Sequence, residues 1–230
     1  MMARMADILL INPNASQAAT DMMVAIAAAT LPAGVHIEGR TALAGPTMIV
    51  DATELGAAAL ELQRTWQRAN EGPNPAWSGV IVSAFGDPGI EALRASTDLP
   101  VTGICEASLL EASQGGRRFG IATVTPDLVA LIQQKVDRLG LGALYTGIRL
   151  TPGEPRALAA DPDALQAALA IAVNECITLD GAEAVVIGGG PLAQAAAQLQ
   201  DRYGVPVIEP IPAAVRQLLA MQAARVASTA

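Results

Sequence analysis

Short apolar runs alternate with longer alanine-rich or amphipathic stretches along the whole chain. These runs have the length and composition of strands that are buried on both faces, as in parallel sheets. They predict strands at residues 7–11, 35–39, 79–83, 101–104, 118–123, 148–151, 184–187 and 205–209. Helices are predicted at residues 17–30, 51–69, 88–96, 127–139, 161–179, 192–203 and 212–224, with Asn14 or Ser16 capping the first. This alternation predicts right-handed βαβ units, and therefore an α/β fold with parallel sheets.

Two of the predicted strands end in glycine-rich turns that have no ionisable side chain at their tips. Residues 82–89 read VSAFGDPG, and residues 187–191 read IGGGP. Each turn is followed, at nearly the same spacing, by a Pro-Val strand start, at residues 100–101 and 206–207. The repetition predicts two similar halves whose turns face each other. Because ligands of such sheets bind at the carboxyl ends of the strands, we expect a ligand between the two turns.

Composition narrows the class of protein further. With 230 residues, of which 52% are hydrophobic, the chain can form one large α/β domain or two small lobes. The net charge of −8 and the aromatic content of only 3% argue against a nucleic-acid partner or an anionic membrane surface. No apolar run reaches the roughly 18–20 residues of a membrane span, and the first residues do not resemble a signal peptide. A cytoplasmic protein is therefore expected.

Metal and disulfide chemistry are not expected either. The two cysteines, Cys105 and Cys176, are too few for a disulfide scaffold in a chain of this size. The single histidine, His36, argues against a zinc site built from histidine and cysteine.

Five segments resemble the aspartate/glutamate/hydantoin racemase superfamily, and within it the hydantoin and allantoin racemase branch. They are residues 11–16 (INPNAS), 85–89 (FGDPG), 100–107 (PVTGICEA), 181–186 (GAEAVV) and 204–207 (GVPV). The resemblance implies two pseudo-symmetric lobes, each with a parallel sheet flanked by helices, and an active-site cleft between them. It implies lobes of residues 1–108 plus 213–230 and of residues 109–212. It also implies a homo-oligomer that needs no cofactor.

The resemblance further implies catalysis by two cysteines, one from each lobe, that exchange a proton on opposite faces of the substrate carbon. The positions that match those cysteines are Ala84 and Gly189, and neither side chain can carry a proton. Cys105 and Cys176 lie elsewhere in the sequence and are expected to be buried structural residues. Racemisation by two thiols is therefore not available to this chain.

The backbone and the polar residues around the turns still predict a binding site for a small carboxylate, an amino-acid derivative or a cyclic ureide. Small residues let such a ligand approach peptide N–H groups closely. The predicted binding residues are Asn12, Asn14, Ser16, Ser83, Phe85, Gly86, Thr123, Thr125, Gly188 and Gly190. Asp87, Glu106 and Glu209 are candidate acids or bases, although each could equally be a cap or a solvated charge.

Several functions fit this site. Proton exchange at a carbon beside a carboxylate, amide or cyclic imide is the function that the resemblance implies. A diverged lyase, decarboxylase or hydrolase could use the same oxyanion-binding turns, and so could a non-catalytic protein that binds small carboxylates or ureides. Residues 188–193 also fit the dinucleotide fingerprint G-x-G-x-x-G/A, with Glu209 downstream. That turn opens the second half and not the first βαβ unit, so no nucleotide cofactor is predicted.

Overall fold

The computed structural model describes residues 7–71, 77–192, 199–200 and 202–229. It contains two four-stranded sheets in which every strand pairing is parallel. The first sheet consists of β1 (Asp7–Asn12), β2 (Ile37–Thr41), β3 (Trp77–Val82) and β4 (Val101–Gly103). The second consists of β5 (Phe119–Thr123), β6 (Tyr145–Leu150), β7 (Ala184–Ile187) and β8 (Val207–Ile208). The predicted α/β class and the predicted parallel sheets are confirmed.

The two sheets have the same strand order, which supports the predicted duplication. The orders are β2-β1-β3-β4 and β6-β5-β7-β8, so β1 and β5 hold equivalent places. In the first sheet, β2 lies on one side of β1 and β3 lies on the other. In the second sheet, β6 and β7 flank β5 in the same way. Such a change of direction in the strand order opens a crevice at the carboxyl ends of the two central strands. Each half of the chain therefore has one such change of direction, at the carboxyl ends of its two central strands.

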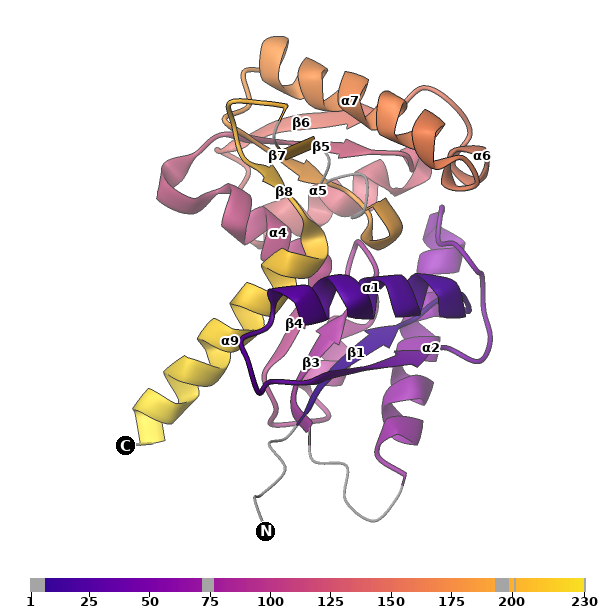
Figure 1. Ribbon diagram of the computed structural model, residues 1–230, viewed down its shortest axis with the longest axis vertical. Coiled ribbons are helices and arrows are strands. Elements are labelled where there is room, and N and C mark those ends of the chain that lie inside the picture. The colour runs from indigo at the N-terminus through magenta and orange to yellow at the C-terminus, as the bar shows by residue number, and fades with distance from the viewer. Residues whose placement is uncertain (1–6, 72–76, 193–198, 201, 230) are drawn as a thin grey trace.

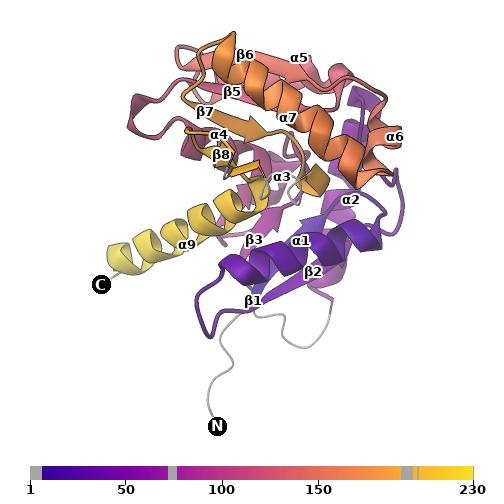
Figure 2. The same cartoon turned by 45° about the horizontal axis from the view of Figure 1, so that its top comes forward.

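Helices cover both sheets, and Figures 1 and 2 show how they are arranged. The helices of the first half are α1 (Gln17–Thr30), α2 (Ala52–Ala69), α3 (Ile90–Arg94) and α4 (Ile104–Ala112). Those that follow are α5 (Val129–Arg138), α6 (Pro155–Ala159), α7 (Pro162–Thr178) and α9 (Pro210–Thr229), with short 3-10 turns at Gln114–Gly116, Pro126–Leu128 and Gly190–Leu192. The predicted helix at residues 192–203 falls largely on residues 193–198 and 201, which lie outside the described residues.

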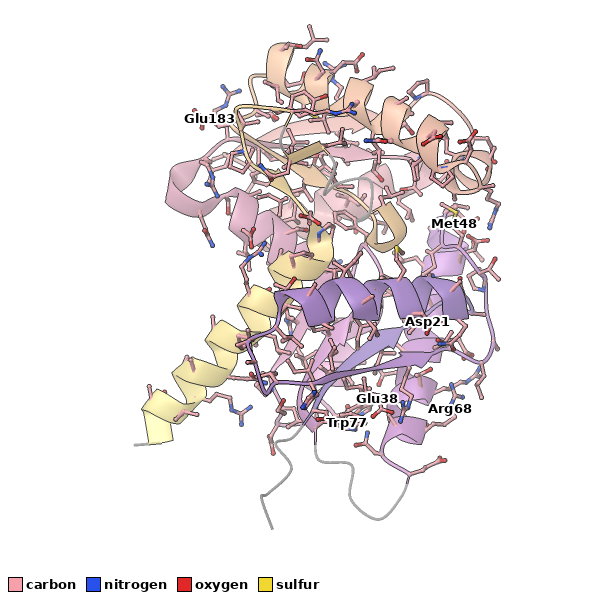
Figure 3. All side chains as sticks on the ribbon, viewed as in Figure 1. Asp21, Glu38, Met48, Arg68, Trp77 and Glu183 are labelled. Carbon is pink, nitrogen blue, oxygen red and sulfur yellow. The ribbon has the colours of Figure 1, made fainter. Side chains whose placement is uncertain are left out.

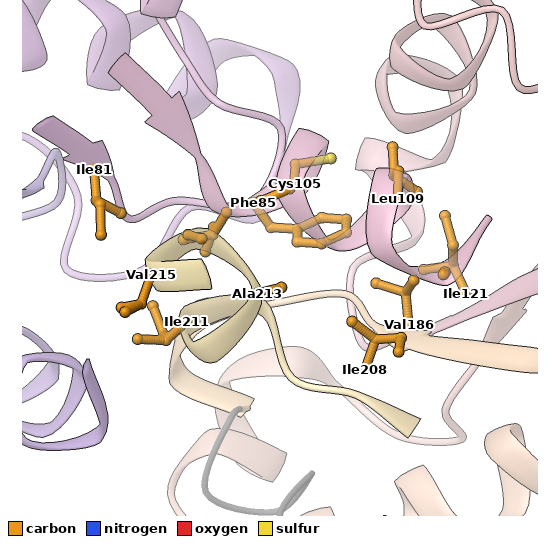
Figure 4. Packing of buried hydrophobic residues seen from close by; sticks show 14 of the residues in the cluster. Ile81, Phe85, Cys105, Leu109, Ile121, Val186, Ile208, Ile211, Ala213 and Val215 are labelled. Atoms are coloured by element: carbon orange, nitrogen blue, oxygen red, sulfur yellow. The ribbon is translucent and has the colours of Figure 1, made fainter. Parts of the chain in front are cut away.

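Alternating burial along the strands produces three hydrophobic clusters. Ile8 and Leu10 of β1 face the largest cluster, while Leu9 and Ile11 face a second one beneath α2 and α3. The third cluster lies between the second sheet and α7. The largest cluster also contains residues of β5, β7 and β8, so the two sheets share one continuous core (Figure 4).

Two helices connect the halves. α4 contacts β4 as well as β7 and β8, and α9 begins beside the second sheet and then packs against α1, α4, β3 and β4 (Figure 1). The expected lobe boundaries, at residues 108 and 212, therefore fall inside α4 and α9. No helix in the part of the chain that the structure describes has both the length and the apolar composition that crossing a bilayer requires.

Candidate functional site

Ser83 holds the first glycine-rich turn against β1. Its backbone N–H and its hydroxyl both donate to the carbonyl oxygen of Ile11, each at 3.0 Å. The Asp87 N–H donates to the Ala84 carbonyl oxygen at 3.0 Å and closes the turn. The N–H groups of Ala84 and Phe85 donate to no acceptor in the described part of the chain, so they are available to a ligand.

Asn12 shapes the neighbouring loop after β1. Its Nδ2 group donates to Asn14 Oδ1 at 2.9 Å and to Thr20 Oγ1 at 3.0 Å. Asn14 Oδ1 also accepts the Ser16 N–H at 3.0 Å, so the Nδ2 group of Asn14 is the end that remains for a ligand. Ser16 Oγ accepts the Ala19 N–H at 3.2 Å, which confirms Ser16 as the cap of α1.

Thr123 holds the second glycine-rich turn against the end of β5. Its hydroxyl donates to the Gly188 carbonyl oxygen at 2.7 Å, and the Gly188 N–H donates to the Ala122 carbonyl oxygen at 2.8 Å. Because that bond uses the single hydroxyl proton of Thr123, Thr125 is the donor in the 3.2 Å contact between the two threonines. A Cβ atom at Gly188 would lie 2.8 Å from Thr123 Cβ, so only glycine fits there.

The two turns meet at one cavity. A Cβ atom at Gly190 would lie only 3.1 Å from the Ser83 carbonyl oxygen, so the backbones of the two turns are in close contact. A cavity of about 480 Å³ opens beside them, and both Ala84 and Gly189 lie on its wall. The other predicted residues on the wall are Asn14, Ser16, Ser83, Phe85, Thr125, Gly188 and Gly190.

Three predicted binding residues stand behind the wall and not on it. Asn12 and Thr123 are fully buried and bind the loops described above. Gly86 is also absent from the cavity wall. In the second turn the Gly189 N–H is also occupied, since it donates to the Ile187 carbonyl oxygen at 3.0 Å. Among the described residues, the turn amides on the wall that donate to no acceptor are therefore those of Ala84, Phe85 and Gly190.

Other wall residues come from segments that the sequence analysis did not connect with the site. Thr47, Met48 and Ile49 lie between β2 and α2, and Asp163 and Gln166 lie in the first turns of α7. Figure 3 shows Met48 on the side of the molecule where α6 lies, and its side chain packs against the cluster beneath α7. The sequence could have indicated these segments, because they follow the edge strands β2 and β6. The carboxyl ends of those strands lie at the same edges of the sheets as the two turns.

The candidate acids Asp87 and Glu106 belong to a buried ionic cluster outside the cavity wall. Lys135 Nζ lies 2.9 Å from Asp87 Oδ2 and 3.3 Å from Glu106 Oε2, and Arg94 also pairs with Glu106. Asp87 accepts the N–H groups of Cys105 at 2.8 Å and of Glu106 at 2.9 Å. The Asp87 side chain therefore binds the N-terminus of α4, whose N-cap residue is Gly103, and not that of the helix directly after it. Burial acts to lower the pKa of Lys135, but the two carboxylates outweigh this effect and raise it.

Glu106 differs from its predicted surroundings, whereas Glu209 lies directly after β8, at a strand end. Glu106 was expected at a strand end, but it lies in the first turn of α4, where its side chain is buried. Glu209 lies between β8 and α9, where its carbonyl oxygen accepts the Ala213 N–H at 3.1 Å. Burial raises the pKa of Glu209, but this residue is also absent from the cavity wall.

The thiols lie away from the cavity as well. Cys105 and Cys176 are fully buried, as predicted. Burial raises the pKa of Cys105 well above its usual value, against the opposing effect of the Gly86 N–H, and it raises the pKa of Cys176 to about 12. Neither cysteine can supply a thiolate to the cavity. Among the described residues, no group of three or more histidine, cysteine, aspartate or glutamate side chains could hold a metal ion.

Two like parallel sheets with one cavity between their glycine-rich turns define an α/β protein of two similar halves. The chain belongs to the Asp/Glu/Hydantoin racemase family, which matches residues 8–218. It is 32% identical over 210 residues to a hydantoin racemase of Paenarthrobacter aurescens, covering 91% of this chain and 88% of that protein. The predicted family resemblance is confirmed, and these relatives assign the chain to the isomerases.

Solved structures agree with this assignment. The allantoin racemase from Klebsiella pneumoniae superimposes with a TM-score of 0.88 at 28% identity, covering 95% of this chain and 88% of that one. The allantoin racemase from Pseudomonas fluorescens gives 0.86 at 27% identity, covering 94% and 90%. Arylmalonate decarboxylase, at 19% identity and a TM-score of 0.61 over 94% and 92% of the two chains, shares the fold alone.

Proposed function

We propose that the cavity binds a small molecule with a carboxylate, amide or cyclic imide beside a tetrahedral carbon, and that the protein exchanges the proton on that carbon without cofactor or thiol. The observation that carries the proposal is the position of Ala84 and Gly189, which lie together on the wall of one cavity. The relatives named as hydantoin and allantoin racemases support this substrate class.

The free N–H groups supply the chemistry that the site retains. When the C–H bond breaks, its electron pair moves onto the neighbouring carbonyl oxygen, and the N–H groups of Ala84, Phe85 or Gly190 can stabilise that oxyanion. Each well-placed donor contributes about 2.7–4 kcal/mol to such a step. In the absence of a thiol, water or hydroxide takes the proton, and water returns one to either face.

This mechanism predicts a slow reaction with a characteristic pH dependence. A positioned general acid or base accelerates proton transfer by roughly 10²–10⁴-fold, and a site without thiols lacks that factor. Since hydroxide is a far stronger base than water, the rate should rise with pH and show no plateau from a titrating cysteine. Iodoacetamide should leave the rate unchanged, because the two cysteines are buried and stay protonated.

Deuterium incorporation tests the proposal. Wild-type protein and the double variant A84C/G189C are incubated in heavy water with benzylhydantoin, allantoin and amino acids, and exchange is followed by mass spectrometry. The double variant should exchange at least 10²-fold faster than wild type and should become sensitive to iodoacetamide. A panel in which neither protein binds a compound or exchanges a proton would overturn the proposal. If wild type binds a ligand but exchanges no proton, the protein is a non-catalytic binding protein and the proposed proton exchange is wrong.

The single variants are the matched controls. Ala84→Cys or Gly189→Cys restores a thiol on one side of the cavity, so each should accelerate exchange of one enantiomer more than the other. A Cβ atom at Gly189 would lie 2.9 Å from Leu192 Cδ1, so Leu192 must move in that variant. Melting temperatures of all variants should therefore accompany the rates, so that a loss of folding is not mistaken for a loss of chemistry.

A further inference from the structure

The first turns of α7 contribute two polar side chains to the cavity wall, Asp163 and Gln166. Asp163 is not the cap of this helix, because the side chain of Asp161 accepts the Ala164 N–H at 3.0 Å. The side chain of Asp163 is solvent-exposed and makes no hydrogen bond or ion pair with the residues that the structure describes. An uncommitted carboxylate therefore stands on the wall of the cavity.

This carboxylate determines the charge that a ligand meets. Asp163 is the one ionisable side chain among the described residues of the wall, which otherwise carry amides, hydroxyls and apolar groups. The carboxylate is an acceptor only, so it favours N–H donors and cations and repels a second anion. The amides of Ala84, Phe85 and Gly190 offer the opposite preference, since they bind an oxygen with negative charge.

We propose that Asp163 determines substrate specificity by accepting an N–H or ammonium group of the ligand. The ligand is then a neutral ureide or a zwitterion, with its carbonyl or carboxylate at the glycine-rich turns and its nitrogen at Asp163. Dicarboxylates bind less tightly, because their second carboxylate would face Asp163. This inference rests on the proposed function of the same cavity.

Two ligands with the same apolar group test this assignment. The dissociation constants of benzylhydantoin, a neutral ureide, and of benzylmalonate, a dicarboxylate, are measured by calorimetry for wild type and Asp163→Asn. Wild type should prefer benzylhydantoin, and Asp163→Asn should shift the ratio of the two constants at least tenfold toward benzylmalonate. Asp161→Asn removes a charge at the same helix end but not from the wall, and an asparagine still caps a helix, so its ratio should stay within about twofold of wild type.

The outcomes separate the two proposals. If both ligands bind and Asp163→Asn leaves their ratio unchanged, the role of Asp163 is wrong while the proposed function stands. The role of Asp163 is equally wrong if wild type binds benzylmalonate more tightly. If wild type and Asp163→Asn bind neither compound, the proposed function fails and this inference fails with it. Circular dichroism of each variant shows whether it has folded.

Discussion

Thr123 and Thr125 are two residues apart and their hydroxyl groups are in contact, but only the Thr123 hydroxyl donates to the second turn. Thr123 binds the Gly188 carbonyl oxygen, whereas Thr125 lies on the cavity wall. Thr123→Val would leave the Gly188 carbonyl without its donor in a buried position, so we expect a loss of about 1–3 kcal/mol in the free energy of unfolding. Thr125→Val should change stability by less than about 1 kcal/mol, but it should weaken ligand binding up to about tenfold.

Urea denaturation and calorimetric titration with benzylhydantoin measure the two effects separately. Each variant serves as the control for the other, because in both a threonine hydroxyl at the end of β5 or just after it is replaced by a methyl group. Equal losses of stability in both variants would contradict the distinct roles assigned to Thr123 and Thr125.

At the scale of elements, Lys135 joins α5 of the second half to the first turn and to α4. Lys135→Met would leave the Asp87 and Glu106 carboxylates buried without this cation, and removing one partner of a buried ion pair costs about 3–5 kcal/mol. The raised pKa of Lys135 means that its contribution to stability is complete below pH 10.5, the usual value, and is lost as the pH rises beyond it. The difference between wild type and variant should therefore shrink in strong alkali.

It should also shrink in mild acid, because burial raises the pKa of Asp87, which has lost its cation in the variant and can take up a proton. Urea denaturation across this pH range provides the measurement. Arg216→Met is the control, since Arg216 is half exposed and its pair with Glu111 should contribute at most about 1 kcal/mol. A loss for Lys135→Met no larger than that of the control would show that the buried cluster does not stabilise the fold.

The sequence predicted most elements but missed α4, and the reason is its burial. Ile104, Cys105, Ala107, Ser108 and Leu109 are buried around the whole circumference of this helix. Such a helix has no polar face, so its sequence lacks the 3.6-residue periodicity that distinguishes a helix from a continued strand. The residues around Glu106 were therefore assigned to the end of a strand, and the partners of Glu106 could not be foreseen.

Among whole-molecule features, the repetition of the two halves was predictable from the sequence, and so was the meeting of the two turns. Both follow from duplicated glycine-rich segments and from the rule that parallel sheets bind ligands at their carboxyl edges. The sequence could not distinguish residues on the wall from those behind it. Asn12 and Asn14 are the same residue type on one loop, and only long-range contacts such as that with Thr20 place Asn12 behind the wall.

Because one core spans both sheets, we expect the two halves to unfold together. Phe119 of β5 is fully buried in the same cluster as Ile8 of β1, and Phe119→Ala should destabilise the protein by about 3–5 kcal/mol. The chain has two tryptophans, and both of them, Trp66 and Trp77, lie in the first half, so their fluorescence reports on a region distant in sequence from the substitution.

In the Phe119→Ala variant, the urea midpoint detected by tryptophan fluorescence should therefore fall together with the midpoint detected by far-ultraviolet circular dichroism. Leu62→Ala is the matched control, because Leu62 lies in the cluster beneath α2, on the tryptophans' own side of the first sheet. It should lower both midpoints by the same mechanism. If Phe119→Ala lowered the dichroism midpoint and left the fluorescence midpoint at its wild-type value, the halves would be independent units. The shared core would then not couple the two turns, and the cavity between them would lack the rigid frame that holds its backbone donors in place.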